Sequence, residues 1–430
     1  MTTKNAPSTT TATTSQERAA RIMERCDRLA RESAEAGKIT RLYGTPELRA
    51  ARDLLDSWMR AAGMTTRTDQ IGNLTGRYGA DPAVANPKTL IIGGHWDSVR
   101  DAGRYDGTLG VLSGIAAVEG LHNAGARLDA AIEVMAFADE EGVRFHTALL
   151  GSSPVAGGFD PAWLTMTDDA GITLGEAIRA FGGDPEAIPG DARGPDDLLG
   201  FIEVHIEQGP VLQERDVPVG VVTGITGSAR AEIVFSGMAG HAGTIPMSSR
   251  RDALTGSAEF ILAVERVGRS VEGLVATVGK LDAEPGASNV VAGRTAQTLD
   301  LRHPDPGVRD RAVAELKAVV DEIGSRRSLE WTWHDSPCFA ETPSDPALTG
   351  TLREAIEHEG IPVVELFSGA GHDAVTMAAI TPVTMLFVRC KDGISHNPAE
   401  SITVEDVAVA LAVLDRFAAS VAATAPAVAS

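Results

Sequence analysis

The amino-acid sequence predicts an α/β protein in which a mixed-sheet domain is interrupted by a smaller α+β domain of ferredoxin-like type. Apolar strand-like runs alternate with amphipathic helical segments in the first half of the chain, and the same pattern returns near its end. Between them, residues 225–336 follow a self-contained ββαββαβ-like succession. We therefore expect a discontinuous larger domain at residues 16–222 and 337–422, with the inserted domain at 223–336.

Two helices are expected to open the larger domain, because good helix formers carry apolar residues at three-to-four spacing over residues 18–33 and 46–63. Gly63 fits the end of the second helix. The segments that follow are expected as strand, helix, strand and strand at residues 89–95, 111–125, 131–138 and 200–212. In such α/β proteins the chemistry lies where strands end in loops.

In and beside the inserted domain, short apolar runs predict strands and longer amphipathic segments predict helices. The strands are expected at residues 217–227, 230–240, 274–281, 295–303 and 329–336, and the helices at 249–268 and 307–324. The larger domain then resumes with a helix, a strand and a last helix at residues 345–360, 381–389 and 404–422. The Thr/Ser-rich residues 1–15 and the closing residues 423–430 predict disordered tails.

The composition is that of a globular protein. Hydrophobic residues make up 43% and charged residues 23% of the 430 positions, which excludes a wholly disordered, collagen-like or membrane-spanning chain. Asp and Glu number 59 against 38 Lys and Arg, and the resulting net charge of −21 argues against nucleic-acid binding. Cys26, Cys338 and Cys390 are too few and too scattered for a disulfide framework or a Cys-rich zinc site. Because the sequence has neither an apolar secretory core nor a membrane-length apolar run, we expect a cytoplasmic protein without a membrane partner.

The strongest functional signal is the segment GGHWDSVRDAGRYDG. In it, His95 and Asp97 lie two apart at an expected strand end, and Asp106 follows in a Gly-flanked turn. Imidazole and carboxylate groups are ligands of borderline divalent metals, and Asp97 is suited to orient His95 by accepting its second N–H. A single histidine at a strand end is more often structural, so the metal interpretation depends on further clusters. Trp96, between the two, either narrows a pocket or packs the strand end.

An acidic cluster, FADEEGVRF, follows the next expected strand. Asp139, Glu140 and Glu141 repel one another and are most simply interpreted as a solvated turn. At the edge of an α/β sheet, however, one carboxylate can bind metal while its neighbour takes a proton from water. The sequence leaves both interpretations open.

Two more clusters contribute histidines. In EVHIEQGP, alternation places His205 and Glu207 on one face of a strand and Gln208 on the other. In GISHNPAES, His396 lies in a loop bounded by Gly and Pro. Two or more histidines and two or more carboxylates from four strand ends suit a two-metal hydrolase.

The inserted domain carries its own polar candidates. His241 lies between glycines in GMAGHAGTIPMS, where it either contacts a ligand or sits on a surface hairpin. Arg302, inside the strand LDLRH, costs desolvation energy unless it meets an anion, and with Asn289 it would suit a carboxylate. The sequence lacks the motifs typical of four other enzyme classes, which argues against each of them. These are G-x-S-x-G of serine hydrolases, H-E-x-x-H of zincins, G-x-G-x-x-G of nicotinamide-dependent enzymes and the P-loop of NTPases.

From about residue 16 to residue 418 the sequence resembles the amidase/hydantoinase/carbamoylase branch of the dinuclear metallo-aminoacylase and carboxypeptidase superfamily. Eight ordered motifs carry the resemblance: DAGRYDGTLG, FADEEGVRF, EVHIEQGPVL, GHAGTIPMS, ASNVV, LDLRH, GAGHDA and LFVRCKDGISHNPAES. The resemblance implies a dinuclear metallohydrolase domain, an inserted domain that acts as lid and dimerisation element, and a homodimer.

The resemblance also implies a role for each matching residue. The implied metal ligands are His95, Asp106, Glu141, His205 and His396, with Asp106 bridging two ions. His95 and His205 would complete the site of one ion, and Glu141 and His396 that of the other. The implied substrate-binding residues are Gln208, His241, Asn289, Arg302, Gly371 and His372.

The same resemblance implies the reaction. Glu140 would be the general base, and His241 would stabilise the oxyanion and reach the neighbouring subunit's site. Allantoate is the favoured substrate, its ureido C–N bond being hydrolysed to give ureidoglycine, carbon dioxide and ammonia in purine catabolism. Hydrolysis of N-carbamoyl-L-amino acids, ureidopropionate or ureidoglycolate remains an alternative, because those activities use the same ligand set.

Two further expectations follow from the ligand set. A catalytically inactive binding protein on this fold is disfavoured, because every ligand position and the base are present. Two divalent ions per subunit are expected, and geometry and supply decide which ions bind such a site. Manganese resembles the allantoate enzymes and zinc the carbamoylases, with cobalt and nickel as further possibilities.

Overall fold

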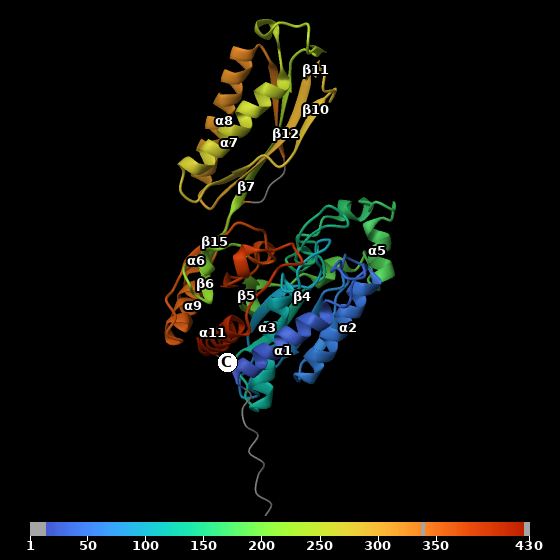
Figure 1. Ribbon diagram of the computed structural model, residues 1–430. Coiled ribbons are helices and arrows are strands. Elements are labelled where there is room, and N and C mark those ends of the chain that lie inside the picture. Colours follow the sequence, from blue (N-terminus) through green and yellow to red (C-terminus); the bar gives the residue numbers. More distant parts are fainter. Residues whose placement is uncertain (1–13, 337–339, 425–430) are drawn as a thin grey trace, which may run out of the picture. The chain divides into compact units, whose positions relative to one another are not determined.

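The computed structural model describes residues 14–336 and 340–424, and it confirms the predicted α/β class with an inserted α+β unit (Figure 1). Among the described residues, unit 1 comprises residues 14–223, 344–366 and 372–424, and unit 2 comprises residues 224–336, 340–343 and 367–371. The junctions lie one and seven residues beyond the predicted ones, and residues 367–371 join the smaller unit. The tail predicted at 1–15 lies outside the described residues up to residue 13, as do Cys338 and the closing residues from 425.

Most of the longer helices of unit 1 begin at polar caps, α3 (Thr108–Asn123) being an exception. Thr14 and Glu17 form a capping box at the first helix, and the Thr45 hydroxyl caps the second, whose first residue is Pro46. The longer helices are α1 (Ser15–Leu29), α2 (Pro46–Ala61), α3 (Thr108–Asn123), α5 (Leu174–Phe181), α9 (Pro346–His358) and α11 (Val404–Ala423). Shorter ones are α4 (Ser152–Val155), α6 (Val211–Glu214) and α10 (Ala374–Met377).

A nine-stranded mixed sheet forms the centre of the larger unit. Its order is β1-β2-β4-β3-β5-β16-β6-β14, and β15 also pairs with β6. The strands are β1 (Thr65–Thr68), β2 (Leu74–Tyr78), β3 (Thr89–His95), β4 (Ala131–Phe137), β5 (Leu198–Ile206), β6 (Val219–Ile225), β14 (Thr342–Pro343), β15 (Glu365–Ser368) and β16 (Val383–Val388). The central strands β4, β3, β5 and β16 run parallel, so their carboxyl ends meet at one edge of the sheet.

Helix α3 packs closely on the central strands and against α1 and α11. The close approach requires glycine at position 110, because a Cβ there would lie 2.5 Å from the carbonyl oxygen of Val204 and 2.8 Å from that of Gly93. The first turn of α3 thereby holds the preceding turn, which contains Asp106, against the ends of β3 and β5.

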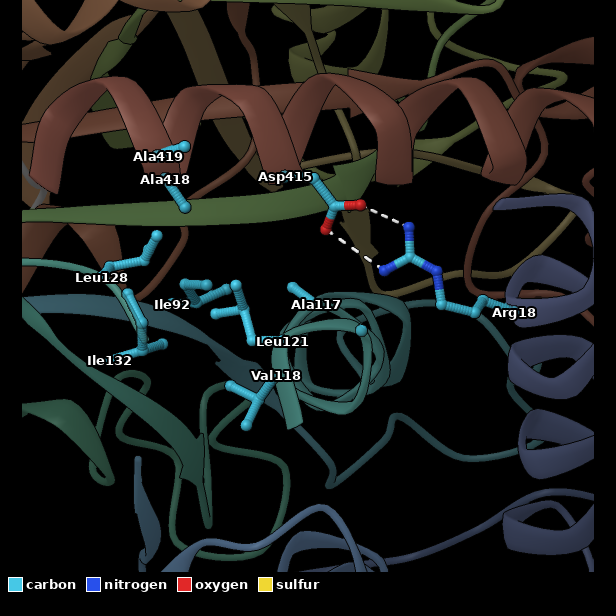
Figure 2. Close-up of a pocket in the computed structure, with 11 residues that line it drawn as sticks. Arg18, Ile92, Ala117, Val118, Leu121, Leu128, Ile132, Asp415, Ala418 and Ala419 are labelled. Carbon is cyan, nitrogen blue, oxygen red and sulfur yellow. Dashed lines mark hydrogen bonds and ion pairs between the residues drawn. The ribbon is translucent and has the colours of Figure 1, made fainter. Parts of the chain in front are cut away.

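A cavity of about 240 Å³ lies between α3, α11 and the sheet, away from the strand ends (Figure 2). Its walls are largely apolar, with Ile92, Val118 and Leu121 among them. At one side Arg18 pairs with Asp415, and its Nη1 also donates to the carbonyl of Ala116 at 3.2 Å. None of the predicted site residues lines this cavity.

Unit 2 is an antiparallel sheet covered by two helices that lie side by side (Figure 1). The sheet order is β10-β12-β7-β13, with β9 also pairing with β12, and a two-stranded sheet joins β8 to β11. The strands are β7 (Gly227–Ser236), β8 (Gly240–His241), β9 (Val275–Thr277), β10 (Leu281–Glu284), β11 (Val290–Val291), β12 (Arg294–His303) and β13 (Glu330–Ser336), and the helices are α7 (Ala253–Ser270) and α8 (Pro306–Arg327). The order of these strands in the sheet, with α7 and α8 between strands along the chain, matches the βαββαβ arrangement of a ferredoxin-like domain.

Some predicted elements were wrong in detail. Strands β1 and β2 were not predicted, because β1 is polar and largely exposed and β2 is only five residues long. The strand predicted at 274–281 is split into β9 and β10, and α3 begins at Thr108 rather than at residue 111. Among the described residues, no helix is long and apolar enough to cross a membrane.

Candidate active site

The carboxyl ends of the parallel strands bring the predicted polar residues of unit 1 together. His95 is the last residue of β3, and His205 is the second-last residue of β5. Both side chains are buried, and so is Glu140, which follows β4. Three stretches of chain far apart in the sequence therefore place histidines and carboxylates at one edge of the sheet, as predicted.

Asp106 lies at the centre of this cluster. Its Oδ1 is 3.4 Å from Nε2 of His95 and 3.3 Å from Nε2 of His205. Its Oδ2 is 3.6 Å from Nε2 of His396, which in turn lies 3.4 Å from Oε1 of Glu141. The two oxygens of one carboxylate thus face two separate groups of nitrogen and oxygen donors, the geometry expected of a bridging ligand.

The tautomer of His205 is set by its neighbours. Its Nδ1 is 2.9 Å from the carbonyl oxygen of Ile206, which can only accept, so Nδ1 carries the proton. Its Nε2 accepts from the backbone N–H of Gly107 at 3.2 Å. Nε2 is therefore the ring nitrogen without a proton, which is the form in which an imidazole nitrogen can bind a metal.

Asp97 has a role that the sequence did not indicate. Its Oδ1 lies 3.3 Å from Nδ1 of His95, but the two atoms do not form a hydrogen bond, and Nδ1 is buried without a hydrogen-bond partner among the described residues. The same carboxylate accepts the backbone N–H groups of Glu140 at 3.0 Å and Glu141 at 3.2 Å. One side chain thus holds the acidic turn and lies beside the histidine.

The cluster holds more negative charge than its surroundings balance. Burial and the adjacent carboxylates raise the pKa of Glu140 well above its usual range, and burial raises the pKa of Glu141 to about 8. Burial alone would raise the pKa of Asp106 as well, but His205 and His95 hold it well below the usual range. Crowded buried carboxylates with imidazoles form a donor set that fits divalent cations, whose charge would offset this repulsion.

Three donor groups in the described part of the chain could each hold an ion. They are His95, Asp106 and His205; His95, Glu140 and Glu141; and Asp106, Glu141 and His396. The first and third share Asp106 and coincide with the two ion sites that the resemblance implied. The fit of these residues to metal is thus supported by the arrangement of their ligand atoms.

The orientation of residues after β5 differs from the simple alternation expected. The Glu207 carboxylate turns away from the cluster and accepts the backbone N–H groups of Val211 and Leu212 at the start of α6. Gln208 adopts a left-handed conformation (φ 56°), and its Nε2 donates to Oδ2 of Asp106 at 2.7 Å. The strand ends at residue 206, so its two-residue period no longer governs these side chains.

Gln208 also has an unused acceptor. Its Oε1 is buried and has no hydrogen-bond partner among the described residues. Such an acceptor is positioned to receive an N–H group of a ligand. His372, another predicted binding residue, is buried with its ring centroid 4.5 Å from that of His205.

In unit 2 the structure brings His241 and Asn289 together. His241 on β8 pairs with Val290 on β11, and the backbone N–H of Ala242 donates to the carbonyl of Asn289 at 2.9 Å. The His241 side chain is exposed, and its Nδ1 accepts the N–H of Gly243 at 3.0 Å. That contact engages Nδ1 and leaves Nε2 as the other nitrogen of the exposed His241 ring.

Arg302 meets an anion that the sequence analysis did not name. Its Nε and Nη2 donate to the two carboxylate oxygens of Asp300, at 2.7 and 2.9 Å, from two positions along the same strand face. Its Nη1 donates to the carbonyl of Gly369 at 2.6 Å, two residues before the predicted residue Gly371. Since a guanidinium has five N–H groups, two remain for a ligand.

Trp96 packs the strand end and does not narrow a pocket. Its side chain is fully buried, and its indole N–H donates to the carbonyl of Leu48 at 3.2 Å. Its own carbonyl accepts from Nε of the buried Arg41 at 2.5 Å. The alternative that it shapes the substrate site is therefore wrong.

Sequence reasoning missed two residues that contact Asp106. The Ser395 hydroxyl donates to Oδ2 of Asp106. The Glu400 carboxylate accepts the backbone N–H of Asp106 at 3.2 Å. Both lie in the motif GISHNPAES, which also contains His396. The signal that would have found them is their sequence proximity to a metal-ligand candidate.

Comparison with known proteins agrees with this geometry. Residues 91–420 match the model of Peptidase family M20/M25/M40. The N-carbamoyl-L-amino acid amidohydrolase of Geobacillus stearothermophilus is 40% identical over 380 residues, which span 88% of this chain and 92% of that protein. The probable allantoate deiminase of Oryza sativa subsp. japonica is 38% identical over 416 residues, spanning 89% of this chain and 84% of that protein.

A solved structure extends the agreement to the fold. An amidase of the hydantoinase/carbamoylase family from Burkholderia multivorans superposes with a TM-score of 0.87 at 36% identity, covering 94% of this chain and 98% of that one. The predicted resemblance to the amidase/hydantoinase/carbamoylase branch is confirmed. The chain belongs to Peptidase family M20/M25/M40.

Proposed function

We propose that this protein is a metal-dependent amidohydrolase that cleaves the ureido C–N bond of allantoate. The observation that carries the proposal is the position of Asp106 between two donor groups, combined with similarity to both allantoate deiminases and N-carbamoyl-L-amino acid amidohydrolases. Substrates of both groups of relatives contain a carboxylate and a ureido or carbamoyl group. Water adds to the ureido carbonyl, the C–N bond breaks to give ureidoglycine and carbamate, and carbamate decomposes to carbon dioxide and ammonia.

The residues that would hold two divalent ions are His95, His205, Asp106, Glu141 and His396. When bound, the ions would supply Lewis-acid polarisation of the substrate carbonyl and would lower the pKa of water toward about 7. Manganese is the ion that we propose for the native enzyme, with zinc, cobalt or nickel able to occupy the same donors.

Glu140 is proposed as the general base. It is buried beside the donor groups, and its backbone N–H is held by the Asp97 carboxylate. It takes the proton from the attacking water and returns it to the leaving amine nitrogen. Burial raises the pKa of Glu140 in the metal-free protein, and nearby cationic charge would bring it down into the range that a base needs.

Unit 2 is proposed to bind the rest of the substrate. Arg302 and Asn289 are assigned to the substrate carboxylate, through the two N–H groups that Asp300 and Gly369 leave on the guanidinium. His241 is assigned to the developing oxyanion through Nε2. We further propose that unit 2 acts as lid and dimerisation element of a homodimer, as the family resemblance implies.

A comparison of turnover tests the proposal. Manganese-loaded protein is incubated with allantoate and, in parallel, with a panel of N-carbamoyl-L-amino acids, and ammonia release is measured. We expect kcat/KM to favour allantoate by a hundredfold, which corresponds to about 2.7 kcal/mol. No ammonia from allantoate together with cleavage of an N-carbamoyl amino acid would refute the substrate assignment.

The second candidate function is N-carbamoyl-L-amino acid hydrolysis. The 40% identity to the Geobacillus stearothermophilus enzyme favours it directly. The unpaired Oε1 of Gln208 offers a discriminating observation, because it matches a polar ureido N–H better than an aliphatic side chain. This candidate keeps the same ion donors and the same base.

A further inference from the structure

Glu400 is a buried carboxylate that was assigned no function in the sequence analysis. It is 4% exposed and lies four residues after His396 in the same loop. Its Oε1 accepts two backbone N–H groups, that of Tyr105 at 2.7 Å and that of Asp106 at 3.2 Å. These donors belong to the turn between β3 and α3, about 290 residues earlier in the sequence.

The loop that carries Glu400 is closed on itself. The backbone N–H of Lys391 donates to the carbonyl of Ser401 at 2.8 Å, which joins the two ends of the loop. Within it, Glu400 donates its N–H to the carbonyl of Asn397 at 3.0 Å, and Ala399 donates to the Asn397 side chain at 2.9 Å. His396 and Glu400 therefore belong to one hydrogen-bonded loop, so a shift of Glu400 is transmitted to His396.

The turn that receives Glu400 is shaped to fit it. Gly103 has an ordinary negative φ, so its backbone conformation does not require glycine. A Cβ at that position would instead overlap the carboxylate of Glu400. The absence of a side chain at residue 103 leaves the space that Glu400 occupies.

We propose that Glu400 is a positioning residue that sets the distance between Asp106 and His396. Its carboxylate holds the backbone of Asp106 while its loop holds His396, so the contact joins two donors of the second ion group. Ser395 adds a second contact between this loop and Asp106, because its hydroxyl donates to Oδ2 of the Asp106 carboxylate. This inference rests on the metal site of the proposed function but not on its substrate.

The test uses cobalt binding to the full-length protein, read by titration calorimetry and by the visible absorption of Co²⁺. Four variants are compared with the wild type: Glu400→Ala, Glu400→Gln, Gly103→Ala and Asp345→Ala. Glu400→Gln keeps an oxygen that can accept the N–H groups of Tyr105 and Asp106, so it retains the contact on which the proposal depends, although the Arg104 backbone N–H also lies near the carboxylate. Asp345→Ala is the matched control, because that carboxylate also accepts two backbone N–H groups, at the start of α9 and away from the cluster.

We expect Glu400→Ala and Gly103→Ala to weaken one of two cobalt-binding events by about 10- to 100-fold, as is typical when a partner that orients a ligand is lost. Their Co²⁺ spectra should change in shape, whereas Glu400→Gln and Asp345→Ala should bind and absorb like the wild type. Circular dichroism establishes that each variant is folded. If Glu400→Ala does not fold, Gly103→Ala is compared with Glu400→Gln. The first variant displaces the Glu400 carboxylate and the second keeps its contact with the turn, so the comparison tests the same point.

Wild-type cobalt binding and spectra in both Glu400→Ala and Gly103→Ala would overturn the inference. An equal loss in Asp345→Ala would also overturn it, because a general loss of stability would then explain the effect. A wild type that binds two ions but releases no ammonia from allantoate would refute the proposed substrate and leave the role of Glu400 intact.

Discussion

The Asp97 carboxylate accepts the backbone N–H of Glu140 at 3.0 Å, and through that contact the end of β3 fixes the turn after β4. The neighbouring N–H of Glu141 reaches the same side chain at 3.2 Å. Two residues proposed for different tasks, one for proton transfer and one for metal binding, thus depend on a single acceptor. The arrangement explains how three adjacent carboxylates can be held in place against their mutual repulsion.

Substitution of Glu140 separates catalysis from metal binding. Glu140→Gln keeps the size of the side chain but removes the group that accepts the proton, so kcat should fall by about 10²–10⁴-fold. The content of bound metal, measured by elemental analysis, should remain near that of the wild type. Retained turnover would contradict the assignment of the base.

Substitution of Arg302 tests whether its guanidinium binds the substrate carboxylate. Arg302→Lys retains the positive charge but loses the planar fork, so KM should rise by about 10-fold or more while kcat changes less. Steady-state kinetics with allantoate provides the measurement. Asp300→Asn serves as a companion variant, because it weakens the partner of Arg302 while keeping the arginine. Unchanged KM in Arg302→Lys would show that the guanidinium serves only the pair with Asp300.

The pH dependence of stability should contain a contribution from Asp69. Burial raises the pKa of Asp69 to about 7 in the folded protein, although it accepts the side-chain N–H of Asn73 at 2.8 Å. The unfolded-state pKa is about 3.9, so the folded state binds the proton more tightly. The contribution is therefore fully present below about pH 4 and is lost as pH rises through about 7.

Urea unfolding of the wild type and of Asp69→Asn at pH 5, 6, 7 and 8 measures this contribution. The variant puts an N–H donor opposite the Asn73 donor, so at pH 5 it should be less stable by about 1–3 kcal/mol, as for a buried unmatched group. The informative quantity is the slope: the stability advantage of the wild type should shrink as pH rises from 5 to 8. A constant difference would show that Asp69 does not titrate in this range.

The ion pair beside the cavity in Figure 2 should support the helix packing of unit 1. Arg18 is almost fully buried, and Asp415→Ala would leave its guanidinium without the carboxylate partner. We expect a loss of about 1–3 kcal/mol in the free energy of unfolding, measured in urea. The double variant Arg18→Met/Asp415→Leu should be closer to the wild type, because it removes both charges. A double variant less stable than Asp415→Ala would contradict this account.

Much of the candidate site was predictable because parallel strands bring their carboxyl ends to one edge. His95, Asp106, His205 and His396 were identified from residue type and place relative to expected strands, and the structure brings them within a few ångströms of one another. Gln208 was predicted to point away from His205 as the next residues of a strand would. Its left-handed backbone reverses that direction, and strand periodicity cannot anticipate where a strand ends.

Hydrogen-bond and ion-pair partners could not be assigned from the sequence, whether they lie near or far along the chain. Trp96 had two open interpretations, and only its contacts with Leu48 and Arg41 decide that it is a packing residue. The anion opposite Arg302 is Asp300, two residues away, although the sequence analysis reserved that position for a substrate. A buried guanidinium needs an anionic partner, but the sequence does not say whether that partner is a substrate or a carboxylate of the protein itself.

The sequence by itself determined the fold class, the order of most helices and strands, and the chemical types that gather at the sheet edge. It did so because hydrophobic periodicity and the types of the polar residues after each strand are local properties of the chain. Tertiary structure decided the tautomer of His205, the direction of Gln208 and the contact of Glu400 with the turn at Asp106. Each of these depends on which backbone groups meet across the fold, and hydrogen bonds act only over about 3 Å.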